Sequence, residues 1–154
     1  GISKRSNGSY DFSEIVKHPA LRLPKDVLVE NKKGRFTKKI EEVLRDDAIV
    51  DAGIQTVASL KEAFTTARYI LWNGTLGIYE KGFVEGTEAL AQAITESGVK
   101  SVVGGGDTLA SISGLHLLDK FSFVSTGGGS MLDFLANEAL PGIQALEEKQ
   151  PERV

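Results

Sequence analysis

Two glycine triplets are the part of this sequence best suited to chemistry. Gly104–Gly106 ends the apolar stretch SVV and precedes Asp107 and Thr108, and Gly127–Gly129 ends the stretch FSFVST and precedes Ser130. Because glycine lacks a Cβ, the backbone can turn sharply there and present several N–H groups to one point. A helix that starts at such a turn adds about half a positive charge. Each triplet therefore predicts a site for phosphate or another oxyanion.

A single triplet has a second interpretation, in which glycine only permits a tight turn between a strand and a helix. Two triplets on successive strand–helix units favour a ligand over that interpretation. Two adjacent anion sites suit a polyphosphate, or a phosphoryl group that passes from one site towards the other.

Acidic residues near these turns suggest how a nucleotide could be held. Asp107 would repel phosphate by itself, but Mg²⁺ bridges carboxylate and phosphate oxygens, so we favour a magnesium ligand over a plain helix-terminal acid. A third loop, WNGTLGIYE, contains Asn73 and Glu80. Glu80 could accept the hydroxyls of a ribose, although a solvent-facing turn residue is the more ordinary reading.

Other phosphate motifs and several partner classes are excluded. No lysine follows either triplet, as a P-loop requires, and Leu109 stands where a dinucleotide fingerprint needs glycine. From Ser101 to Leu135 the only Lys or Arg is Lys120, so these loops lack the positive charge that phosphoryl transfer needs. The net charge of −3 argues against a nucleic-acid partner, and no apolar run is long enough for a membrane span. With no cysteine in the chain, we expect a reducing, cytoplasmic setting.

The 154 residues, 41% hydrophobic and 25% charged, suit one globular domain. We expect a loose or peripheral segment over residues 1–20 and a domain over residues 21–154. LPKDVLVEN predicts a strand, and the ambiguous stretch after it favours strands near residues 37–43 and 48–50 over a charged helix. A capping box at Ser59–Glu62 predicts a helix start.

From residue 67 onward, strands and helices alternate. Strands are predicted in ARYILWNG, KSVVGGG and FSFVST, and helices in GTEALAQAITESG, TLASISGLHLLDK and SMLDFLANEAL. Gly98 is expected to stop the first of these helices, with Leu90, Ala93 and Ile94 facing the core. This order predicts the α/β class, a three-layer α/β/α Rossmann-like domain with a mainly parallel sheet covered on both faces.

The motifs WNGTLGIYE, VVGGGDTLASI, FVSTGGGSMLDFL and LPGIQAL, in this order and spacing, resemble the C-terminal lobe of phosphoglycerate kinases, and the likeness extends from about Leu21 to Leu146. The resemblance implies a two-lobed glycolytic kinase that transfers a phosphoryl group reversibly between ATP/ADP and 3-phosphoglycerate/1,3-bisphosphoglycerate. In this family the C-terminal lobe binds Mg²⁺ with ADP or ATP, and the N-terminal lobe binds 3-phosphoglycerate.

The resemblance also implies a role for individual residues. Asp107 matches the magnesium ligand, Glu80 the ribose-binding acid and Asn73 a nucleotide contact. The second triplet matches the helix start that faces the transferring phosphoryl group, and Ser125 and Thr126 lie where movement between the lobes is felt. The nucleotide-binding residues implied are Asn73, Glu80, Gly105, Gly106, Asp107 and Thr108, and the catalytic ones are Thr126, Gly127, Gly128 and Gly129.

The sequence departs from the family in two residues and in extent. Thr75 and Ile54 stand where the family has proline. The N-terminal lobe and the start of the C-terminal lobe, with a lysine that assists transfer and part of the adenine wall, have no counterpart. We therefore expect nucleotide binding without turnover by this chain alone. A non-catalytic nucleotide-binding or interaction module derived from the lobe, and an unrelated phosphosugar-binding α/β domain, are the alternatives.

Overall fold

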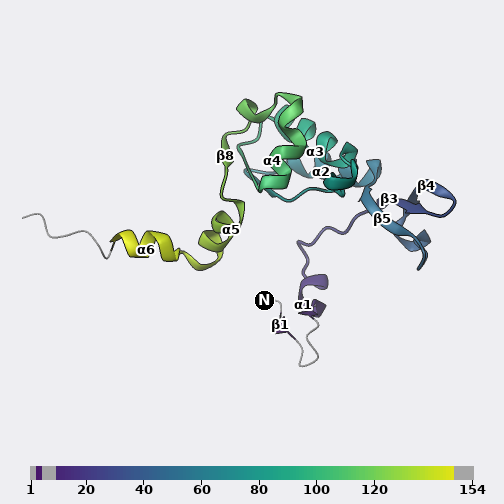
Figure 1. The fold of residues 1–154 in the computed structure, drawn as a ribbon, viewed down its shortest axis with the longest axis horizontal. Coiled ribbons are helices and arrows are strands. Elements are labelled where there is room, and N and C mark those ends of the chain that lie inside the picture. The colour runs from purple at the N-terminus through teal and green to yellow at the C-terminus, as the bar shows by residue number, and fades with distance from the viewer. Residues whose placement is uncertain (1–2, 5–9, 148–154) are drawn as a thin grey trace, which may run out of the picture.

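The computed structural model describes residues 3–4 and 10–147. Strands β1 (Ser3–Lys4) and β2 (Tyr10–Asp11) pair antiparallel, and the short helix α1 (Ser13–Val16) follows. Figure 1 shows α1 apart from the remaining helices and sheets. Residues 1–2 and 5–9 of the segment expected to be loose, residues 1–20, lie outside the described residues.

A three-stranded antiparallel sheet follows, with β3 (Asp26–Asn31) between β4 (Gly34–Lys39) and β5 (Ala48–Ala52). The strand predicted in LPKDVLVEN is confirmed as β3. The strands predicted near residues 37–43 and 48–50 also exist, as β4 and β5, but β4 begins and ends earlier than predicted. Asn31 pairs with Gly34 across a two-residue turn, and the positive φ of Gly34, 126°, allows that turn. The tight turn therefore sets where β4 starts.

Helix α2 (Ile54–Phe64) begins five residues before the predicted capping box, so that prediction is wrong. Ser59 lies inside the helix, where its hydroxyl donates to the carbonyl of Thr56 (2.9 Å). The helix is capped instead by a residue distant in sequence. Asp26 accepts hydrogen bonds from the amides of Gln55 (3.1 Å) and Thr56 (2.7 Å), which are orphan donors of the first turn.

The second half of the chain forms the parallel sheet that the alternating pattern predicted. Strand β7 (Ser101–Gly104) lies between β6 (Ile70–Asn73) and β8 (Phe123–Ser125). The connections are made by helices α3 (Glu85–Ser97) and α4 (Gly106–Ile112), and α5 (Gly128–Asn137) follows β8. Leu90, Ala93 and Ile94 are buried as predicted, and Gly98 ends α3 with a φ of 68°.

One face of this sheet holds the core. Because neighbouring residues of parallel strands in register share a face, Trp72, Val103 and Val124 point the same way. The core that they join also contains these residues of β6, α3, α4 and the segment before β8: Ile70, Leu90, Ala91, Ile94, Ile112 and Phe121.

The other face is covered less than expected. Leu71 is 42% exposed and Phe123 is 62% exposed, and they lie on either side of Val102. The start of helix α5 contacts this face near Gly104, at the carboxyl end of β7. Helix α5 then projects with α6 (Pro141–Glu147) away from the other helices (Figure 1). The α/β class, with a parallel sheet and flanking helices, is confirmed, but helix coverage of its two faces is unequal.

The helix predicted over TLASISGLHLLDK is shorter than expected. Helix α4 ends at Ile112, and two 3₁₀ turns, Ser113–Leu115 and Leu118–Lys120, replace the rest. The Ser113 hydroxyl donates to the carbonyl of Ala110 (2.9 Å), a local bond that competes with helix continuation. His116 follows with a φ of 52°, so the chain turns there. Over the described residues, every helix falls short of the length and apolarity needed to cross a membrane.

Candidate functional site

The candidate site lies at the carboxyl edge of the parallel sheet. Asn73 pairs with Gly104, and Gly104 pairs with Ser125, so the three strands end level with one another. The three loops singled out in the sequence therefore leave the sheet side by side. This is the edge at which open parallel sheets bind ligands.

Asn73 lies between the two glycine turns. Its Nδ2 donates to the carbonyl of Gly128 at 3.4 Å, and a Cβ on Gly105 would overlap its Oδ1. Gly105 also has a φ of 97°, a conformation that residues with a Cβ rarely adopt. The side chain from β6 thus joins the turn after β7 to the turn after β8.

The two glycine turns also touch each other directly. A Cβ on Gly128 would lie 2.7 Å from Cα of Gly105 and would overlap its amide nitrogen. Only glycine at these positions lets the two backbones approach so closely. The first residue of α5 is therefore held against the turn that begins α4.

Thr108 has a position that the sequence did not indicate. Its side chain is 1% exposed, and its Oγ1 accepts a hydrogen bond from the amide of Gly74 at 2.9 Å. Gly74 makes a second hydrogen bond, in which its carbonyl accepts from the indole N–H of Trp72 (2.8 Å). In this structure the Thr108 hydroxyl anchors the third loop from beneath, and its suggested phosphate contact stays a prediction.

The remaining site residues of the sheet edge face solvent. Gly106 and Asp107 are exposed at the start of α4, and Thr126, Gly127 and Gly129 are exposed at the start of α5. Glu80 is exposed in a 3₁₀ turn, Tyr79–Lys81. The structure thus brings Asn73 and both triplets together, and it places Glu80 on the loop that continues from Asn73.

The donor set fits magnesium held largely by a ligand. Within residues 3–4 and 10–147, no three His, Cys, Asp or Glu side chains gather to form a metal site of their own. Asp107 is one exposed carboxylate beside a turn suited to phosphate. Mg²⁺ commonly takes one or two carboxylates and completes its shell with phosphate oxygens and water. Asp107 could hold such an ion only together with a bound polyphosphate.

Thr75 and Ile54, the two departures from the family pattern, are accommodated locally. The Thr75 hydroxyl donates to the carbonyl of Gly77 (2.9 Å), which closes the turn where proline would stiffen it. Ile54 is the first residue of α2, a position where proline is favoured but not required, and it is 80% exposed. Neither substitution disturbs the sheet edge.

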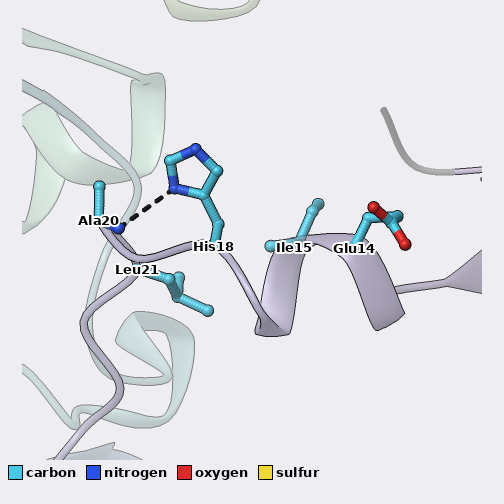
Figure 2. A pocket seen from close by; sticks show the side chains of 5 residues that line it. All are labelled: Glu14, Ile15, His18, Ala20 and Leu21. Carbon is cyan, nitrogen blue, oxygen red and sulfur yellow. Dashed lines mark hydrogen bonds between the residues drawn. The ribbon is translucent and has the colours of Figure 1, made fainter.

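A hollow of about 470 Å³ beside α1 does not form a second candidate site. Figure 2 shows its His18 ring turned towards the amide of Ala20, with the Glu14 carboxylate pointing away from it. These side chains are exposed and do not converge on a common point.

Sequence reasoning missed two buried aspartates that each support the start of a helix. Asp26 is 1% exposed and accepts two backbone amides in the first turn of α2. Asp51 is 2% exposed and accepts the amide of Gly86 at the start of α3. The only local signal is a nearby glycine: Gly53 packs against Asp26, and Gly86 against Asp51. Neither glycine is adjacent to its partner in sequence, so the pairing becomes visible only in the folded chain.

Comparison with known proteins shows what this chain is similar to. The family model described as phosphoglycerate kinase matches residues 12–138. A phosphoglycerate kinase of Coxiella burnetii is 40% identical over 141 residues, which cover 88% of this chain and 36% of that protein. The chain therefore spans about a third of the length of this curated relative.

Solved structures agree with the sequence match. The phosphoglycerate kinase of Coxiella burnetii superposes with a TM-score of 0.74 at 39% identity, covering 89% of this chain and 36% of that one. The phosphoglycerate kinase of Pyrococcus horikoshii superposes with a TM-score of 0.76 at 35% identity, covering 87% and 35%. Since the family model spans most of the chain and the fold agrees, this chain belongs to the phosphoglycerate kinase family.

Proposed function

We propose that this chain is the magnesium–nucleotide-binding part of a phosphoglycerate kinase. The full reaction is the reversible transfer of a phosphoryl group between ATP/ADP and 3-phosphoglycerate/1,3-bisphosphoglycerate. The observation that carries the proposal is the junction of three strand ends, where Asn73 lies between two touching glycine turns. Backbone N–H groups at such turns suit the phosphates of a nucleotide.

Different residues of the site bind different parts of the nucleotide. Gly105 and Gly106 present backbone to the phosphates, and Asp107 would hold Mg²⁺, which would supply positive charge beside them. Glu80 takes the ribose hydroxyls. The start of α5, with Thr126 and Gly127–Gly129, faces the phosphoryl group being transferred, where backbone N–H groups and the helix dipole stabilise negative charge.

Transfer itself depends on groups outside this chain. Lys120 lies in a 3₁₀ turn before β8, at the opposite edge of the sheet from the glycine turns. Phosphoryl transfer depends on positioning and on positive charge around the transferring group. The chain alone therefore binds Mg²⁺ and nucleotide without turnover, and the acceptor and the missing charge come from the N-terminal lobe and the rest of the C-terminal lobe.

Titration calorimetry with Mg²⁺ and ADP tests this function. Binding should depend on Mg²⁺ and should weaken by about tenfold or more in Asp107→Ala, because a charge-assisted ligand is lost. Asp119→Ala is the matched control: it removes the same charge from an exposed 3₁₀ turn at the other edge of the sheet and should bind as the wild type does. Wild-type protein that binds no ADP would refute the proposal, and equal binding by Asp107→Ala would refute the metal ligand alone.

A further inference from the structure

Asp51 of β5 is a buried carboxylate with no part in the site described above. It is 2% exposed, and burial raises its pKa even though two backbone amides favour the charged form. Oδ2 accepts from the amide of Gly86 (3.0 Å) at the start of α3, and Oδ1 accepts from the amide of Ala52 (2.8 Å). A buried carboxylate needs hydrogen-bond partners, and those of Asp51 fix the start of α3 against β5.

The carboxylate also supports the loop over residues 74–84. A Cβ on Gly77 would lie 2.6 Å from Cγ of Asp51, and a Cβ on Gly86 would overlap its Oδ1. The loop and the start of α3 therefore close directly over the carboxylate, with no side chain between. Replacing the carboxylate by a smaller group leaves a gap beneath Gly77.

The backbone on both sides of Gly77 is fastened to the same two elements. The amide of Ile78 donates to the carbonyl of Val50 (2.9 Å), next to Asp51 on β5. The amide of Leu76 donates to the hydroxyl of Thr87 (3.0 Å), next to Gly86 on α3. Asp51 thus lies at the point where β5, α3 and the loop meet.

The same loop carries Glu80, two residues after Ile78. Resting on the proposed function, we propose that Asp51 is a positioning residue for nucleotide binding: it fixes loop 74–84 so that Glu80 is presented to the ribose. The phosphate-binding turns have contacts of their own, through Asn73 and between Gly105 and Gly128. They meet this loop at its first residue, where the Gly74 amide donates to Thr108, three residues before Gly77, which packs over Asp51. Loss of Asp51 therefore weakens recognition of the sugar and spares recognition of the phosphates.

Asp26 provides a matched control. It is also a buried aspartate of the antiparallel sheet, it also caps a helix start, and it also packs against a glycine, Gly53. Among the described residues, its carboxylate accepts hydrogen bonds from Gln55 and Thr56 in the first turn of α2 and none from loop 74–84. If Asp51 acted only as a helix cap, Asp51→Ala and Asp26→Ala would therefore change nucleotide binding in the same way.

The test compares the affinities of the full chain for Mg²⁺–ADP and for Mg²⁺–tripolyphosphate, which has no ribose. Asp51→Ala should weaken ADP by about tenfold and tripolyphosphate by less than about twofold. Asp26→Ala should give the same ratio of the two affinities as the wild type. Asp51→Asn keeps the size and one acceptor, and it serves in the same comparison if Asp51→Ala does not fold.

Hydrogen exchange of the Ile78 amide gives a readout that needs no ligand. It should speed up in Asp51→Ala relative to Asp26→Ala, because the loop loses its support. Equal weakening of both ligands, or unchanged exchange at Ile78, would overturn the positioning role while the proposed function stands. Wild-type protein that binds no ADP would overturn the proposed function and this role with it, whether or not it binds tripolyphosphate.

Discussion

Replacing Gly128 by alanine tests the contact between the two glycine turns. A Cβ there would lie 2.7 Å from Cα of Gly105 and 2.9 Å from Oδ1 of Asn73. Cα of Gly105 is a backbone atom of the turn that begins α4, so it cannot swing aside as the end of a flexible side chain could. Gly129, the next residue of α5, has no atom within 4 Å of where its Cβ would stand, and it is exposed. The pair therefore separates crowding from helix propensity.

The expected magnitudes follow from these two environments. Alanine is favoured over glycine in a helix by about 0.5–1 kcal/mol, so Gly129→Ala should be more stable than the wild type by about that amount. Gly128→Ala gains the same helix-propensity stabilisation, but crowding against Gly105 costs about 1–3 kcal/mol. The free energies of unfolding of the two variants should therefore differ by about 1–3 kcal/mol. For a chain of this size, that corresponds to roughly 2–12 °C in Tm.

Urea unfolding monitored by circular dichroism measures this difference, with Tm by calorimetry as a second reading. Gly128→Ala should also bind Mg²⁺–ADP more weakly than Gly129→Ala, because its two turns are pushed apart. Two variants of equal stability would refute the direct contact between the turns. A less stable Gly129→Ala would refute the placement of α5.

Two further predictions concern the small sheet and the core. The Lys38 ammonium, with the backbone amide of Leu44 and the side-chain amide of Asn31, lowers the pKa of Asp47 to about 2. The ionised carboxylate therefore stabilises the fold above its unfolded pKa of 3.8, and this stabilisation is lost as the pH falls from about 4 to 2. Lys38→Met should therefore raise the pKa of Asp47, as followed by NMR titration, and an unchanged pKa would contradict the ion pair. Ile94→Ala should cost about 2–5 kcal/mol in urea unfolding because Ile94 is 1% exposed, whereas Ile54→Ala, at an 80% exposed residue, should stay within about 0.5 kcal/mol. Similar losses in both would contradict the assigned core.

Helix boundaries show how far local sequence signals reach. The start of α3 and its end at Gly98 could be predicted because the apolar spacing and the glycine stop lie within the helix or next to it. The start of α2 could not, because its cap is supplied by Asp26, 30 residues from Thr56 in sequence. Ser59–Glu62 has the residue types of a capping box, but the chain is already helical there. The cap from β3 exists only after the sheet has formed, so the local sequence of α2 does not reveal it.

The sequence by itself determined the elements of the site. Alternating strands and helices predicted a parallel sheet, and both glycine triplets were predicted at strand ends because apolar runs stop there. Apolar periodicity and glycine stops are local properties, so the sequence reveals them before any two elements pack together. The meeting of the three loops at one edge then follows from the geometry of parallel strands.

Only the tertiary structure decided what each side chain does at that edge. It buried Thr108 beneath Gly74, placed Asn73 between Gly105 and Gly128, and set Asp51 under loop 74–84. Each of these contacts joins segments far apart in the chain, and each depends on sub-ångström clearance around a glycine or on a buried hydrogen bond. Such contacts leave no periodic trace in the sequence, because their partners become neighbours only when separate elements pack together.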